Sequence, residues 1–454
     1  MSAPAIPANR PPWKPGQFIP GRALMERTRM TAACMAAEPR HYWRIALLST
    51  LVAVVPLAGS APYNLLKAVL LLALLVTGVV LIRRQPDVRL RYRIARFIVI
   101  ACLLRLAFAF FSITWHDLRW SELDLPAQML LYLGTAAVFA AVLDWRLIWT
   151  LFALSTLVFG GSCIVQHHVM GLERAYGFSG GEWTAIEFTM VTLCMALFSV
   201  IRLIQPNVHP AERCLHGVAV AVGVYGSILA QSRGPILAFI PAMLMVMTVH
   251  VWRTRRWRGP LAFVGALVIG VLGATTVLNH QVIQRFGEVS GEIAGFNQHN
   301  EVGSVRERIA MWGVAVDAIA EHPLTGVGLN QFGTYAREGI ARGEVSDAIS
   351  RYNHPHNEYL EAAVTGGVPL LLIMLLIFIL PGIHFVRRIG HADETTAMVA
   401  TAGLAVVIVY ALSAFTDNVF YRAMPHSFYF YLVLGFVLAT ALPVRDLRRD
   451  GSSH

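Results

Sequence analysis

Repeated apolar stretches of about 20 residues constrain this chain more than any other feature of its sequence. A helix needs about 20 apolar residues to cross the hydrocarbon core of a bilayer, and the 454-residue sequence contains many such stretches. Only 14% of its residues are charged, against about 25% in a typical soluble domain. Because so few charges cannot cover a water-facing surface of that size, we predict an all-α polytopic membrane protein.

The apolar stretches predict about twelve transmembrane helices. The candidate spans are residues 45–60, 63–82, 94–113, 127–143, 146–166, 184–204, 215–232, 235–252, 260–278, 364–386, 397–415 and 426–442. The stretches at 45–60 and 127–143 are short for a complete crossing.

The placement of arginine predicts how these helices are oriented. Arginines cluster in alternate connections, for example at 83–96, 253–258 and 445–449, and the basic residues of membrane proteins concentrate on the cytoplasmic side. Both termini are therefore expected inside, which requires an even number of spans. Residues 1–43 then form a cytoplasmic N-terminal tail, and residues 444–454 form a cytoplasmic C-terminal tail.

The domain organisation follows from this topology. Spans one to nine occupy residues 44–278, a long outward connection occupies 279–363, and the last three spans occupy 364–443. A connection of this length with helical periodicity of its own is usually functional. The net charge of +10 lies in short clusters between the apolar stretches, so we expect membrane lipids and no nucleic acid as partners.

Within the long connection, residues 304–322 show the pattern of an amphipathic helix. Ser304 and Glu307 have the spacing of a capping box, and Pro323 ends the pattern. Such a helix would pack on other loop segments or on the membrane surface. The apolar residues that recur at helical spacing, and that should share the packed face, are Val305, Ile309, Trp312, Val316 and Ile319.

A histidine-rich polar cluster follows at residues 352–359, just before a predicted span. Histidine is the side chain best suited to move protons near neutral pH, so His354 and His356 are candidate catalytic residues. Two structural alternatives stay open: His356 or Asn357 can cap the next helix, and the two histidines can bind a metal ion. No carboxylate-rich segment lies beside them in the sequence, so we expect no metal.

Arg233 is an unusual arginine because it lies between two apolar stretches, on the predicted outward side. An arginine at membrane depth costs a few kcal/mol, which makes it a functional candidate, although an arginine in a turn can also extend to the surface. Together with Arg306 and Arg308, it predicts an anionic ligand at the outward surface. The guanidinium donors match phosphate oxygens in geometry.

In this order, the motifs resemble those of the O-antigen ligase/polymerase superfamily. Each motif alone is weak evidence, but the order in which the motifs occur, from about residue 231 to 370, is specific. The shared pattern is Ser232-Arg233-Gly234 at a span end, Arg308-x-x-x-Trp312, His322-Pro-Leu-x-Gly326-x-Gly328, Phe332, His354-x-His356-Asn357 and Gly366-Gly367.

The resemblance implies an inverting, metal-independent glycosyltransferase of the bacterial inner membrane without a cofactor, in which residues 279–363 are a periplasmic catalytic loop. The donor would be O-antigen polysaccharide on undecaprenyl pyrophosphate, and the acceptor a sugar hydroxyl of lipid A-core oligosaccharide. Carried onto this chain, the general base is His356, and its supporting residues are His354 and Asn357. The pyrophosphate-binding residues are Arg233, Arg308 and, with a less certain alignment, Arg306.

Several other functions stay open at this point. Within the superfamily, an O-antigen polymerase would use a lipid-linked glycan as acceptor, and a protein O-oligosaccharyltransferase would use a protein. A lipid-glycan flippase or transporter would carry ionisable residues in the middle of its spans. A metal-dependent glycosyltransferase would use Glu122 and Asp124, although an acidic outward turn explains this pair more simply.

Overall fold

The computed structural model describes residues 39–58, 64–178, 184–259 and 304–441, together with the single residues 181, 261 and 265. The chain divides into two compact units, Met1–Leu48 and Ser49–His454. Within the described residues, the first unit contains only the N-terminal half of helix α2 (Pro39–Ala58), and every other helix belongs to the second.

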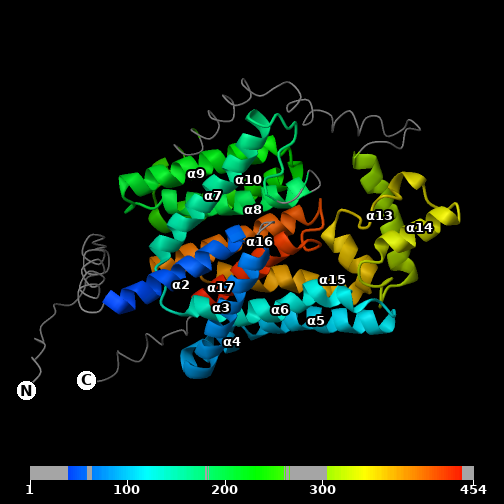
Figure 1. Cartoon of the computed structure of the whole chain (residues 1–454), viewed down its shortest axis with the longest axis horizontal. Helices are drawn as coiled ribbons and strands as arrows, with labels where there is room; N and C mark the ends of the chain where they lie inside the picture. The colour runs from blue at the N-terminus through cyan, green and yellow to red at the C-terminus, as the bar shows by residue number, and fades with distance from the viewer. Residues whose placement is uncertain are drawn as a thin grey trace, which may run out of the picture. The chain divides into compact units, whose positions relative to one another are not determined.

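The described residues form helices and no strands, as predicted for an all-α protein (Figure 1). Before residue 260 the elements after α2 are α3 (Asn64–Arg84), α4 (Pro86–Ile94), α5 (Arg96–Trp115), η1 (Trp120–Leu123), α6 (Asp124–Thr135), η2 (Ala136–Ala140), α7 (Trp145–His168), α8 (Ala185–Leu203), α9 (Pro210–Leu229) and α10 (Arg233–Thr254). From residue 304 onward they are α13 (Ser304–Glu321), α14 (Phe332–Ala341), η5 (Asp347–Ile349), α15 (Glu358–Val386), α16 (Glu394–Ser413) and α17 (Ala423–Thr440).

Among the described residues, nine helical segments are long and apolar enough to cross a membrane. They lie in α3, α5, the continuous η1–α6–η2 segment, α7, α8, α10, α15, α16 and α17. Each coincides with a predicted span, so the chain is a multi-pass helical membrane protein. The total of about twelve spans and the periplasmic position of the long connection remain predictions.

The other three predicted spans have different outcomes. The span at 45–60 corresponds to α2, whose apolar part, Tyr42–Leu57, is shorter than the nine candidates. The span at 215–232 lies in α9, which is not among the nine because polar residues occupy its first two turns. The span at 260–278 falls outside the described residues, apart from positions 261 and 265.

Helices α8, α16 and α17 form the buried centre of the second unit. The buried share of their apolar stretches is 83%, 78% and 83%, against 17% for α3. Helix α16 contacts α8, α10, α15 and α17, which can be followed in Figure 1. The loop between α16 and α17 is therefore held by well-packed helices at both of its ends.

Helix α15 changes direction at Gly367, where φ is 64°, a value that glycine adopts without steric cost. The turn at residues 323–328 packs against this kink. The backbone N–H of Val327 donates to the carbonyl oxygen of Val364 at 2.9 Å, and a Cβ on Gly326 would lie only 2.5 Å from the same oxygen. The two glycine motifs predicted from the sequence thus form one contact, which attaches the loop helices to α15.

Helix α13 forms where the sequence predicts it, but the predicted packed face is only partly correct. Trp312 and Ile319 pack against the buried cluster of the loop helices, whereas two other members of the predicted face do not. Ile309 is 40% exposed and Val316 is 57% exposed. The prediction assumed that the large apolar side chains face the core. In the structure, small alanines occupy much of the buried face, which lets α13 approach α14 and α15 closely. The buried cluster on this side consists of Met311, Val314, Ala315, Ala318, Phe332, Ala336, Ile349 and Val364.

Candidate active site

The residues just before α15 form a turn that we call the histidine turn, residues 352–357. Its last residue, Asn357, is the N-cap of α15: the side-chain oxygen accepts hydrogen bonds from the backbone N–H groups of Tyr359 and Leu360, at 3.0 and 3.1 Å. His356 has a φ of 50°, in the left-handed region that non-glycine residues rarely adopt. Such backbone strain is concentrated at functional sites, where the surrounding structure maintains it.

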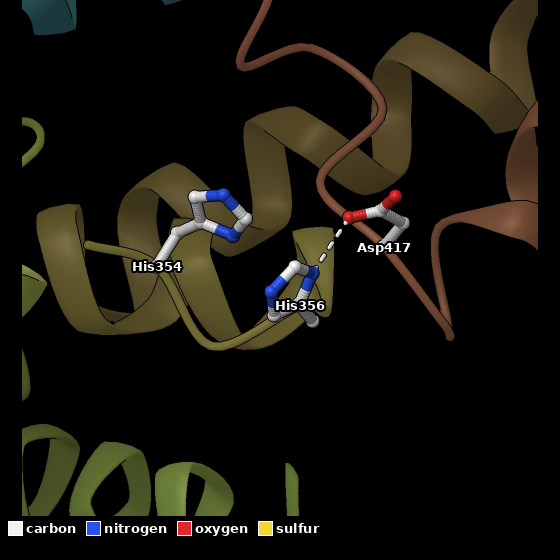
Figure 2. A group of neighbouring side chains, drawn as sticks. All are labelled: His354, His356 and Asp417. Atoms are coloured by element: carbon white, nitrogen blue, oxygen red, sulfur yellow. Dashed lines mark hydrogen bonds and ion pairs between the residues drawn. The ribbon is translucent and has the colours of Figure 1, made fainter. Parts of the chain in front are cut away.

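Asp417, in the loop between α16 and α17, lies beside His356 (Figure 2). The Nδ1 atom of His356 and the Oδ1 atom of Asp417 are 2.9 Å apart. Burial alone would raise the pKa of the Asp417 carboxyl, but the hydrogen bond and charge of His356 hold this pKa below its ordinary value. An ionised Asp417 accepts the Nδ1 proton, which leaves Nε2 of His356 as a proton acceptor.

His354 packs against the same pair. Its ring centroid lies 4.4 Å from that of His356 and 4.5 Å from that of Tyr421. Burial, reinforced by the neighbouring His356, lowers the pKa of His354 to about 4. His354 is therefore neutral near pH 7 and supports the arrangement of the cluster without adding charge to it.

The cluster also has the composition of a metal site. In the described part of the chain, His354, His356 and Asp417 are the only group of three such residues whose ligand atoms all lie within 4.8 Å of one another. The expectation of no metal rested on the lack of a neighbouring carboxylate, and this premise was wrong because the fold brings Asp417 to the histidines. Glu122 and Asp124 form no comparable group there.

Arg233 is the first residue of α10 and lies next to the loop that contains Asp417. The contact is shown by Gly234, where an added Cβ would lie 2.2 Å from the Oγ1 atom of Thr416. Arg233 is half-buried. Because a helix N-terminus also favours anions, this end of α10 adds positive potential beside the His356–Asp417 pair.

Arg308 lies one helical turn before Trp312, on the same face of α13. The Nε1 atom of Trp312 donates to the carbonyl oxygen of Pro355 at 2.9 Å, so this face is held against the histidine turn. Arg308 and Arg306 are both half-buried, but Arg306 is two residues away and projects from another side of the helix. Arg308, unlike Arg306, therefore shares the face of α13 on which Trp312 contacts the histidine turn.

Glu307 provides a second attachment between α13 and the histidine turn. Its carboxylate accepts hydrogen bonds from the Arg351 guanidinium, at 2.7 Å, and from the Tyr352 hydroxyl. Glu307 is buried, and the Tyr352 ring lies edge-on to His356, with a centroid distance of 5.4 Å. The spacing that predicted a capping residue thus marks a residue that holds the histidine turn.

A polar cavity of about 910 Å³ adjoins the cluster. Asn353 of the histidine turn and Tyr421, which contacts His354, both line it. The same wall contains Arg422, whose Nε lies 2.8 Å from the Glu187 carboxylate. Pockets of about 300–1,000 Å³ are typical of ligand sites, so the cavity can hold a polar substrate beside the histidine turn. His354, His356 and Asp417 are not part of its described lining.

Sequence reasoning missed Asp417, Tyr421 and Arg422. The available signal was the position of Asp417 between two apolar stretches, the same signal that identified Arg233. The predicted topology also puts the connection after residue 415 on the outward side, together with the long loop. An ionisable group at such a boundary is a functional candidate by default.

Residues 218–375 match a family model described as O-antigen ligase. The matched segment extends from α9 into α15 and includes the three candidate arginines and the histidine turn, but not Asp417.

Individual relatives are more distant. An uncharacterised protein of Haemophilus influenzae is 19% identical over 321 residues, which cover 70% of this chain and 79% of that protein. An O-antigen ligase of Escherichia coli K12 is 23% identical over 273 residues, which cover 59% of this chain and 62% of the ligase. The alignment thus spans less than two thirds of that enzyme. These matches confirm that the chain resembles the O-antigen ligase family, as its motifs predicted.

Proposed function

We propose that this protein is a glycosyltransferase of the O-antigen ligase/polymerase type in the bacterial inner membrane, with its active site facing the periplasm. The observation that carries the proposal is the His356–Asp417 pair. His356 lies in the segment that matches the O-antigen ligase family, and a buried carboxylate orients its imidazole at 2.9 Å. The arrangement is suited to a general base next to a cavity that can hold a substrate.

The reaction joins an acceptor hydroxyl to the anomeric carbon of a glycan carried on undecaprenyl pyrophosphate. As the hydroxyl oxygen attacks, Nε2 of His356 takes its proton, and Asp417 stabilises the imidazolium that forms. The bond between the anomeric carbon and the pyrophosphate oxygen breaks on the opposite face, so the configuration inverts. Undecaprenyl pyrophosphate leaves with the electron pair.

The arginines make this leaving group stable without a metal ion. Arg233 and Arg308, with Arg306 nearby, contact the pyrophosphate and neutralise the charge that develops on it. Their positions on two helix ends that flank the histidine turn support this role. The lipid tail of the donor stays in the bilayer while its head group enters the site.

Among the members of this superfamily, we favour a ligase whose acceptor is a sugar hydroxyl of lipid A-core oligosaccharide. The 910 Å³ cavity supports a saccharide acceptor because its wall offers carboxylates, amides and the Tyr421 ring, the groups that bind sugar hydroxyls and ring faces. A polymerase and a protein O-oligosaccharyltransferase are the alternatives.

Reconstitution tests the proposal directly. The purified protein receives undecaprenyl-pyrophosphate-linked glycan with lipid A-core in one reaction and no added acceptor in another. A ligase attaches glycan to lipid A-core only in the first reaction, whereas a polymerase lengthens the lipid-linked glycan in both. If no glycan is transferred in either reaction, with acceptor protein also tested, the proposed activity is wrong.

A metal-dependent form of the same reaction is the second candidate, because His354, His356 and Asp417 can converge on one ion. We predict that transfer continues after EDTA treatment, since the arginines neutralise the leaving group. The measurement is the rate of transfer before chelation, after chelation and after a divalent ion is restored. Loss and recovery of activity would assign the cluster to metal binding.

A further inference from the structure

A second cavity, of about 700 Å³, lies at the opposite end of α10 from Arg233. It is bounded by the end of α8, the start of α9, the end of α10 and residues 255–259. Helix α10 has 22 residues and is therefore about 33 Å long, close to the thickness of a bilayer core. The cavity thus lies a membrane thickness from the active site, on the side predicted to be cytoplasmic.

The described lining of this cavity is strongly basic and includes no acidic residue. Its four arginines are Arg213, Arg255, Arg256 and Arg258. Within the described chain, none of these four has a carboxylate within ion-pair distance. The Nη2 atom of Arg213 donates to the backbone oxygen of Gln205 at 3.1 Å, which fixes this arginine at the cavity wall.

Other arginines on the same face are already bound to protein groups. Arg202 and Arg146 share the Glu212 carboxylate, at 2.6 and 3.2 Å. Arg253 donates to two backbone carbonyls in the connection after α15, at 2.7 and 2.9 Å. Membrane topology explains why basic residues occupy this face, but it does not explain why four of them line one cavity without acidic partners.

The cavity also has an apolar side. Leu203, Ile204 and Trp257 are part of its lining, and Trp257 is 61% exposed. Trp252, two residues before the end of α10, is 52% exposed. Exposed tryptophans are typical of the boundary between lipid and water, so the cavity lies at the level where lipid headgroups are found.

We propose that this cavity binds the phosphate headgroup of an anionic phospholipid from the adjacent leaflet. The arginine forks match phosphate oxygens in geometry and charge, and the apolar edge accepts the start of the acyl chains. Basic pockets between membrane helices on the cytoplasmic side recognise such headgroups. The bound headgroup bridges the ends of α8, α9 and α10, away from the catalytic cluster.

Native mass spectrometry of the full-length protein tests this site without depending on glycan transfer. The protein is equilibrated with equal amounts of phosphatidylglycerol and phosphatidylcholine, and the lipids that it retains are counted. The wild type is expected to prefer phosphatidylglycerol by about tenfold or more, a difference of about 1.4 kcal/mol. The triple variant Arg255→Gln/Arg256→Gln/Arg258→Gln should retain the two lipids about equally.

A matched control removes the same charge elsewhere on the same predicted face. The variant Arg83→Gln/Arg84→Gln/Arg93→Gln changes exposed arginines of α3 and α4 and should keep the preference for phosphatidylglycerol. Replacing the three cavity arginines by lysine keeps the charge that sets orientation but should weaken the preference, because lysine lacks the fork.

Two results would overturn the proposal. One is an unchanged lipid preference in the triple glutamine variant. The other is retention of inorganic phosphate by the wild type, lost in that variant, without any preference between the two lipids. That second result would identify the cavity as a site for a soluble anion.

Discussion

The charged groups near the two ends of α10 differ in whether they have partners of opposite charge. At the Arg233 end, acidic and basic groups are paired: His356 with Asp417, and Arg422 with Glu187. At the other end, four arginines line a cavity that has no acidic residue among its described lining. Paired charges fix the orientation of side chains, whereas unpaired ones keep their capacity to bind an anion. The difference is what we expect if the proposed chemistry and the proposed lipid binding occur at opposite ends of α10.

The largest expected effect concerns His356, the centre of the paired end. A positioned general base contributes about 100- to 10,000-fold, so His356→Ala should lose that much turnover while donor binding stays nearly intact. His354→Ala should lose less, because its ring only supports the cluster. The measurement is single-turnover transfer to lipid A-core beside a separate donor-binding assay. Wild-type transfer by His356→Ala would mean that the base is another residue, and lost donor binding with intact chemistry would make His356 a phosphate contact.

Substitutions of Arg233 and Arg308 test whether the Arg233 end of α10 also binds an anion. Removing one preorganised donor to developing charge costs about 100- to 1,000-fold in rate, so either alanine variant should lose most transfer. Lysine variants should be intermediate, since the charge remains and the fork is lost. Arg83→Ala, an exposed arginine on α3, serves as the control and should transfer normally. Near-normal transfer at normal membrane abundance would remove that arginine from the site.

Asp417→Asn separates the orienting role of the carboxylate from that of the base itself. A hydrogen bond to a charged group is worth about 1.5–3 kcal/mol, and each ~1.4 kcal/mol is a factor of ten in rate. We expect a loss of about 10- to 100-fold in kcat with little change in KM for the acceptor. A change confined to KM would instead assign Asp417 to substrate binding.

The smallest expected effect is on stability. The pKa of His354 is lowered to about 4, from an ordinary value of about 6.5. Between these values the unfolded chain binds a proton that the folded protein does not. The free energy of unfolding is therefore fully retained above pH ~6.5 and falls as the pH drops towards 4. Asp417 contributes in the same direction only at lower pH, because its pKa is held below the ordinary value.

Thermal unfolding of the purified protein measures this effect. The midpoint should be lower at about pH 4.5 than at about pH 7.5, and His354→Gln should reduce the difference. His322→Gln, which changes an exposed histidine just after α13, is the matched control and should leave the pH dependence in place. Equal pH dependence in wild type and His354→Gln would contradict the neutral state of the half-buried His354.

The membrane helices could be predicted from the sequence because a long apolar stretch has few alternatives to a membrane span. Helix boundaries were less predictable where polar residues become buried. Helix α15 begins at Glu358 because Asn357 caps it, and both Glu358 and Glu361 are buried in its first turns, where the sequence alone indicated the end of a polar loop.

Only the candidate site residues that lie close together in the sequence could be predicted. His354, His356 and Asn357 are close in sequence, so their spacing identified them. Asp417 is 61 residues from His356, and their contact depends on how the ends of α15 and α16 pack. No periodicity or motif within one segment encodes that distance, which is why the carboxylate was missed.

The hydrogen bond from Trp312 to Pro355 couples the position of α13 to that of His356, the proposed base. Arg308 lies on the same face of α13. A donor that displaces this arginine on binding would therefore also displace Pro355, the residue between the two histidines. If the base deprotonated water in place of the acceptor hydroxyl, the donor would be hydrolysed. A shift of α13 on donor binding would bring His356 into position only once the donor is bound. This coupling would limit hydrolysis of the donor.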